Sequence, residues 1–161
     1  MKSTASIAGH PLHPMLVDFP IGLFVFSLAC DVIYRAGYST AWQSAAYFAI
    51  GGGIIGALVA AVPGFIDLVT MPDKKAQNLG VWHMCTNLVM VVLFAVNMYL
   101  RAATGAGPGP LLVLSIVGVV LLIVAGGLGG SMVYVHGAAV GPVHEHVETP
   151  ESGSGGGRVA A

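Results

Sequence analysis

Charged side chains are scarce in this sequence. Of its 161 residues, 8% are charged and 56% are hydrophobic, whereas soluble domains carry about 25% charged residues. So few charges cannot cover a water-facing surface, which excludes a soluble enzyme and a disordered chain. The formal net charge of -1 lacks the basic excess that binds phosphates, so we expect no nucleic-acid partner.

Cysteine and short cofactor motifs are also scarce. The two cysteines are Cys30 and Cys85, and the register predicted below separates them by about 22 Å along the bundle axis, too far for a disulfide. No Cys-x-x-Cys, Cys-x-x-Cys-His or His-Glu-x-x-His motif occurs. A metal or haem site must therefore be assembled from residues that are distant in the sequence.

Long apolar segments are abundant instead, and the mean hydropathy is +0.85. A helix needs about 20 apolar residues to cross the hydrocarbon layer, and four segments meet this length, at about 14–34, 41–69, 79–100 and 111–135. Helices are expected because lipid offers no partner to unpaired backbone groups. We predict an all-α integral membrane protein, a bundle of four transmembrane helices within residues 1–141 that contacts the lipid bilayer, followed by a flexible tail at 142–161.

A weak internal repeat suggests that the four spans form two related helical hairpins. An offset of 70 residues places His13 on His83 and Leu23-Phe24 on Leu93-Phe94. The second and fourth spans align poorly at this offset. Two such hairpins would be related by a pseudo-twofold axis along the membrane normal.

Alternating spans predict that the histidines gather at one membrane face. His10 and His13 precede or open the first span, His83 opens the third, and His136 closes the fourth. Imidazole is the commonest metal ligand, and ligands on several helices at one depth suit a haem or a transition metal. We expect haem b or a transition metal there, with His13, His83 and His136 as cofactor ligands and His10 as a further metal ligand.

Three other polar residues are predicted near this histidine face. Asp67 ends the second span, Asp18 lies about one turn inside the first, and Asn87 lies one turn below His83 on the same helix face. Such groups either orient ligating imidazoles or relay protons across part of the membrane.

The opposite membrane face carries a predicted ion pair. Asp31 and Arg35 are four residues apart and can pair along one helix side, and Arg101 ends the third span at the same level. Because a carboxylate facing lipid is costly, we expect Asp31 to point into the bundle.

Different functions are compatible with these residues. The leading hypothesis is redox or electron-transfer work at the histidine face, with a redox partner or a second copy of the chain as partner. The alternatives are a proton-coupled carrier of small solutes that uses Asp18, Asp67 and His83, and a non-catalytic membrane subunit or scaffold. In the last case the polar residues only cap helices or reach lipid headgroups.

An ordered series of motifs resembles the bacterial membrane family called domain of unknown function 2231, over about residues 9–140. The motifs are His10-Pro-Leu-His-Pro14, Phe19-Pro-Ile-Gly22, Asp31, Pro63-Gly64 with Asp67, His83 with Asn87, and Gly129-Gly130 leading to Val133-Tyr-Val-His136-Gly137. The resemblance implies a four-span protein of the bacterial inner membrane. Relatives joined to Rieske-type or cytochrome-like modules point to redox work, but no such module is present in this chain.

The basic residues predict the orientation by a narrow margin. Lys2, Lys74 and Lys75 flank the histidine face, whereas Arg35 and Arg101 lie opposite. The positive-inside rule then favours cytoplasmic termini.

Overall fold

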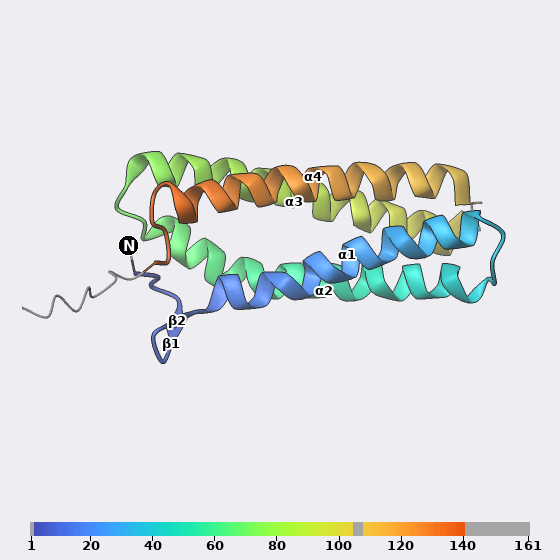
Figure 1. Ribbon diagram of the computed structural model, residues 1–161, viewed down its shortest axis with the longest axis horizontal. Helices are drawn as coiled ribbons and strands as arrows, with labels where there is room; N and C mark the ends of the chain where they lie inside the picture. Colours follow the sequence, from blue (N-terminus) through green and yellow to red (C-terminus); the bar gives the residue numbers. More distant parts are fainter. Residues whose placement is uncertain (1, 105–107, 141–161) are drawn as a thin grey trace, which may run out of the picture.

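The computed structural model describes residues 2–104 and 108–140 and contains four long helices side by side (Figure 1). They are α1 (Leu12–Arg35), α2 (Ala41–Val69), α3 (Lys74–Thr104) and α4 (Pro108–Tyr134). All four are long and apolar enough to cross a membrane, which confirms the predicted all-α bundle. Helix α3 extends several residues beyond its predicted span at both ends, because hydropathy detects only the part of a helix that lies in hydrocarbon. The predicted tail at 142–161 lies outside the described residues.

Each helix packs against the next in the sequence, and α4 closes the ring against α1. The helices α1 and α3 therefore face each other across the centre of the bundle. Their closest aromatic contact is the stack of Phe24 on Phe94, with ring centroids 4.1 Å apart and planes inclined by 12°. Ile50, Met90 and Leu122 complete the buried core around this stack.

The contacts of the first hairpin recur in the second. Phe24 of α1 packs against Gly53 of α2, where an added Cβ would lie 2.7 Å from its ring. Phe94 of α3 packs in the same way against Gly118 of α4, at 2.6 Å. Phenylalanine on one helix thus meets glycine on its partner in both hairpins, as expected for two related hairpins.

A short β-hairpin precedes α1. Strands β1 (Ser6–Ile7) and β2 (His10–Pro11) pair antiparallel, and the turn between them holds Ala8 and Gly9 at φ values of 49° and 80°. Helix α1 begins at Leu12, so His10 lies on strand β2 and His13 lies in the first helical turn. Pro14 lies in the first helical turn, where its missing N–H removes no helical hydrogen bond.

The polar connections gather at the two ends of the bundle. The N-terminus, the β-hairpin, the α2–α3 connection and the end of α4 lie together at the left of Figure 1. The α1–α2 connection and the start of α4 lie at the other end. The up-down path of the chain thus brings His13 of α1 and His83 of α3 to the same end.

Candidate functional site

His13 lies in the first turn of α1 and is oriented by α2. Its Nδ1 donates a hydrogen bond to the carbonyl oxygen of Ala60, at 2.8 Å. The ring lies against Gly64, where an added Cβ would be 2.6 Å from Nδ1, so only glycine lets the ring reach this carbonyl. A carbonyl oxygen can only accept, and the Nδ1 atom of a neutral ring therefore carries the hydrogen while Nε2 keeps a lone pair.

His83 has the same environment in the second hairpin. Its Nδ1 donates to the carbonyl oxygen of Ala125 in α4, at 2.8 Å, and its ring lies against Gly129, with an added Cβ 3.2 Å from Cε1. The Asn87 amide nitrogen lies 3.1 Å from Nε2. Because an amide N–H only donates, Nε2 of His83 accepts this bond and carries a lone pair.

The two imidazole rings meet across the centre of the bundle. Their centroids are 6.2 Å apart and their planes are inclined by 88°. The residues around the rings repeat too: Ala60 and Gly64 correspond to Ala125 and Gly129, with an offset of 65 residues. The second and fourth spans align poorly at an offset of 70 because His83 and Ala125 are 42 residues apart, whereas His13 and Ala60 are 47 residues apart.

A cavity of about 840 Å³ lies beside both rings. Its wall is mostly apolar, and Asn87 is the amide that contributes to it together with the two histidines. Gly64, Gly126 and Gly129 also line it, and an added Cβ at Gly126 would have no neighbour within 4 Å. Gly126 thus leaves open space beside the backbone of α4, whereas the space at Gly64 and Gly129 is filled by the histidine rings.

The other two predicted histidines lie away from this pair. His10 is exposed on strand β2, and its Nδ1 donates to the carbonyl oxygen of Ala8 at 3.0 Å. His136 follows α4, and its Nδ1 donates to the carbonyl oxygen of Ser131 at 3.3 Å. Neither ring lines the cavity. Within residues 2–104 and 108–140, no three His, Cys, Asp or Glu side chains are grouped to hold a metal ion, so the expected four-histidine set is not assembled there.

The two predicted carboxylates do not contact the histidine pair. Asp67 accepts hydrogen bonds from Ser3 Oγ, at 2.8 and 2.9 Å to its two oxygens, and from the Ala5 amide at 2.9 Å. It therefore holds the N-terminal segment against α2 rather than orienting an imidazole. Asp18 is exposed on the outer surface of α1. Of the predicted neighbours, Asn87 alone bonds to a histidine of the pair.

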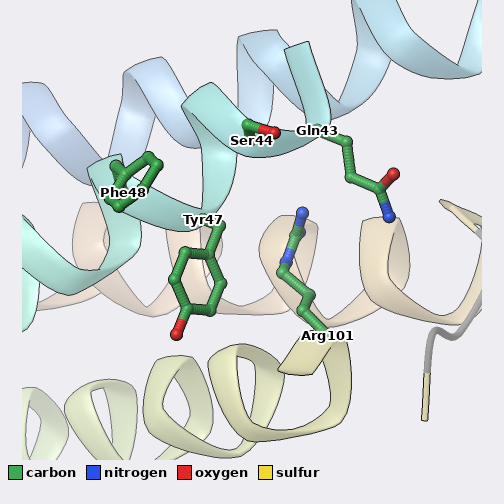
Figure 2. A pocket seen from close by; sticks show the side chains of 5 residues that line it. All are labelled: Gln43, Ser44, Tyr47, Phe48 and Arg101. Atoms are coloured by element: carbon green, nitrogen blue, oxygen red, sulfur yellow. The ribbon is translucent and has the colours of Figure 1, made fainter. Parts of the chain in front are cut away.

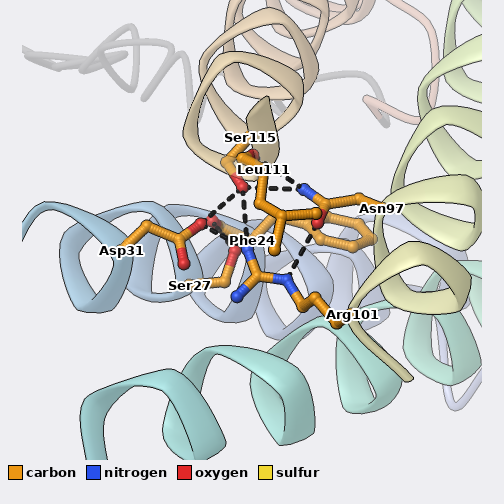
Figure 3. A network of polar contacts seen from close by, with 7 residues as sticks. All are labelled: Phe24, Ser27, Asp31, Asn97, Arg101, Leu111 and Ser115. Atoms are coloured by element: carbon orange, nitrogen blue, oxygen red, sulfur yellow. Dashed lines mark hydrogen bonds and ion pairs between the residues drawn. The ribbon is translucent and has the colours of Figure 1, made fainter. Parts of the chain in front are cut away.

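At the opposite end, the partner of Asp31 comes from another helix (Figure 3). Arg101 Nη2 lies 2.6 Å from Asp31 Oδ2, and both side chains are only 4% exposed. Arg35, the expected helical neighbour, is exposed. Asp31 thus points into the bundle, as expected, and of the two predicted arginines Arg101 is its partner. The predicted Asp31–Arg35 contact is wrong, because Arg35 ends α1 and faces outward.

Two further residues complete the ion pair, and sequence reasoning missed their role. Ser115 Oγ donates to Asp31 Oδ2 at 2.6 Å, and Asn97 Oδ1 accepts from Arg101 Nε at 2.8 Å. The Asn97 amide also donates to Ser115 Oγ at 2.9 Å. Two sequence observations could have indicated this role. Ser115 is a polar residue in the uncharged fourth span, and Asn97 lies one turn before Arg101. Within the described part of the chain, no buried side-chain N or O atom lacks a hydrogen bond.

A small pocket of about 240 Å³ lies beside Arg101, between α2 and α3 (Figure 2). Gln43, Ser44, Tyr47 and Phe48 line it together with the arginine. The charge of Arg101 is already balanced by Asp31, which leaves this pocket without a net charge to attract an anion. The histidine pair is therefore the candidate site.

Comparison with known proteins agrees with the resemblance noted in the sequence. The family described as "Predicted membrane protein (DUF2231)" matches residues 9–142, a range that contains all four helices and both histidines of the pair. No curated protein and no solved structure matches the chain. The chain belongs to the DUF2231 family of membrane proteins.

Proposed function

We propose that this membrane protein binds haem b between His13 and His83 and transfers electrons within the membrane. The observation that carries the proposal is the symmetric histidine pair: two rings 6.2 Å apart, each with Nδ1 bonded to a backbone carbonyl. Metal-ligating histidines typically donate their other ring N–H in this way, which fixes the tautomer and the ring orientation.

The distance between the rings is suitable for one metal ion. With metal–nitrogen bonds of about 2 Å, two imidazoles on opposite sides of an ion have centroids roughly 6 Å apart. The observed separation of 6.2 Å agrees with this value. A ligand hydrogen-bonded to both rings would need a wider gap, because it would add its own length to two hydrogen bonds of about 2.9 Å.

The number of ligands favours haem over a bare ion. Protein-bound transition ions usually take four or more donor atoms, whereas the structure groups only two imidazoles within its described ranges. A porphyrin supplies the remaining four donors itself. The apolar cavity of about 840 Å³ beside the pair has room for such a flat ligand, and Gly126 leaves open space beside the backbone of α4.

Two imidazole ligands suit electron transfer. When bound, haem supplies the one-electron chemistry of its iron. His13 and His83 would hold the iron through their Nε2 atoms, and the Asn87 amide would have to release Nε2 of His83 for this. The protein then binds the group, orients it through the Ala60 and Ala125 carbonyls, and excludes water through the apolar wall of the cavity.

The proton-relay alternative has less support from the geometry. It requires Asp18, Asp67 and His83 to form a chain of proton carriers. Asp67 is bonded to Ser3 and Ala5, and Asp18 is exposed on the outer surface of α1. The scaffold alternative predicts that replacing His13, His83 and His136 by Gln leaves the activity of its complex intact.

The test is an absorption spectrum of the detergent-purified protein, expressed with added haem precursor. We expect a Soret band with the sharp visible bands of six-coordinate haem, and its loss in both His13→Ala and His83→Ala. His10→Ala and His136→Ala are matched controls and should retain the band. Metal analysis of the same samples separates haem iron from a bare transition metal.

A protein that folds as a helical monomer or oligomer but has no Soret band under these conditions contradicts the proposal. Equal haem content in His13→Ala and the wild type would also contradict it, because it would place the haem elsewhere.

A further inference from the structure

The N-terminal strap, which we define as residues 2–11, lies at the membrane-surface end of the cavity and is bonded to α2. Asp67 binds Ser3 and Ala5, and Thr70 Oγ1 donates to Thr4 Oγ1 at 2.8 Å. Ser3 and Thr4 themselves line the cavity. The Leu12 amide donates to the Ala5 carbonyl oxygen at 2.9 Å, which ties the strap to α1 as well.

The segment after α4 lies at the same end and belongs to the other hairpin. Ala138 and Ala139 line the cavity, and the Ala138 amide donates to the Met132 carbonyl oxygen at 2.9 Å. Hydrogen-bonded peptide segments from both hairpins thus line the cavity at this end.

On the side between α2 and α3, the cavity wall consists mostly of apolar side chains. Leu68 of α2 lies against Gly80 of α3 near the strap, and Met98 of α3 lies against Gly51 of α2 deeper in the bundle. Between these levels the cavity wall includes side chains that are also largely exposed on the outer surface. They are Leu58 (57%), Phe65 (55%) and Leu88 (63%).

The cavity wall also includes residues on the opposite side of the bundle, between α1 and α4. There the cavity wall is formed by Val17 and Ile21 of α1 and by Gly126 and Gly130 of α4. Gly126 has no neighbour within 4 Å of an added Cβ. Apolar residues thus form the cavity wall on both sides where the two hairpins face each other.

We propose that the occupant of the histidine cavity enters and leaves sideways, from the hydrocarbon layer, through the portal between α2 and α3 formed by Leu58, Phe65 and Leu88. This inference rests on the proposed haem site and adds the source of the ligand: a porphyrin dissolved in the membrane. The route follows from the wall chemistry, because a flat apolar ligand crosses an apolar portal without desolvating peptide groups. Entry from the water side would require the hydrogen bonds between Asp67 and the strap to break.

The test measures the rate of haem uptake by protein prepared without haem and reconstituted in lipid vesicles. Haem is supplied either from donor vesicles or from albumin in water, and the Soret band is followed in time. We expect faster uptake from the donor vesicles. Leu58→Trp narrows the portal and should slow uptake by about tenfold with unchanged final occupancy.

Two variants serve as controls for this test. Val59→Trp adds the same ring at a neighbouring exposed position that does not line the cavity, and it should load like the wild type. Ser3→Ala removes the hydroxyl group whose hydrogen is shared between the two Asp67 oxygens and should leave the uptake rate unchanged.

The outcomes distinguish a failure of the proposed entry route from a failure of the proposed haem site. Equal rates for Leu58→Trp and Val59→Trp, or faster uptake by Ser3→Ala, would overturn the lateral route while the haem site stands. If the wild-type protein acquires no Soret band from either source, the proposed function fails and the route fails with it.

Discussion

At the scale of single residues, two glycines decide where the histidine rings lie. Gly64 and Gly129 leave the space that the His13 and His83 rings fill, and the rings then reach carbonyl oxygens of the adjacent helix. The sequence identified both histidines, and it showed Pro63-Gly64 and Gly129-Gly130 as motifs. It could not show that each glycine contacts a ring, because that contact depends on the rotation of one helix against another.

Gly64→Ala tests this contact. The new methyl group would lie 2.6 Å from His13 Nδ1, so the ring must leave the Ala60 carbonyl. We expect a loss of about 1–3 kcal/mol in the free energy of unfolding and a lower haem content. Gly22→Ala is the control, because an added Cβ there meets nothing within 4 Å. Equal stability and haem content for both variants would show that the ring does not need the glycine.

At the scale of the elements, the polar network around Asp31 joins three helices. Asp31 comes from α1, Arg101 and Asn97 from α3, and Ser115 from α4. The spacing of Asp31 and Arg35 on one helix suggested a local pair, but a carboxylate inside the bundle requires a partner that also points inward. Sequence spacing along one helix carries no information about partners from other helices, which explains the error.

Arg101→Met tests the network. It leaves Asp31 buried without its counter-ion, and breaking a buried pair in this way costs about 3–5 kcal/mol. Arg35→Met, at an exposed position on the same membrane face, should change stability by less than about 0.5 kcal/mol. Both are measured by unfolding the detergent-solubilised protein in increasing dodecyl sulfate. A loss of similar size in the two variants would contradict a specific role for Arg101.

At the scale of the whole molecule, two polar centres lie near opposite ends of the helix bundle. His13 and Asp31 are separated by about 27 Å along α1, close to the hydrocarbon thickness of about 30 Å. The aromatic stack of Phe24 on Phe94 lies between them. The cavity between the hairpins is a property of this assembly, and no single helix contains it.

A cavity-filling pair of variants tests this arrangement. Gly126→Leu places a side chain where the cavity wall has open space, so the bundle should fold while haem content falls strongly. Gly127→Leu has equally open surroundings but does not line the cavity, and it should bind haem like the wild type. Equal haem content in the two folded variants would place the ligand outside this cavity.

The orientation of the molecule gives a further prediction. Lys2, Lys74 and Lys75 lie at the histidine end of the bundle and Arg35 and Arg101 at the other, so the positive-inside rule places the histidine end in the cytoplasm. Reporters fused to either terminus should be active only if they function in the cytoplasm. Activity of a periplasmic reporter at the N-terminus would reverse the orientation.

The sequence by itself determined the number of helices, their approximate spans and the common depth of His13 and His83. These properties depend on hydrophobic length and on the alternation of spans, and both are read along the chain. Only the tertiary structure decided that His13 meets His83 while His10 and His136 lie apart, and that Arg101 rather than Arg35 pairs with Asp31. Depth does not specify the direction in which a side chain points around its helix; that direction is set by the packing of rings into glycine gaps between neighbouring helices.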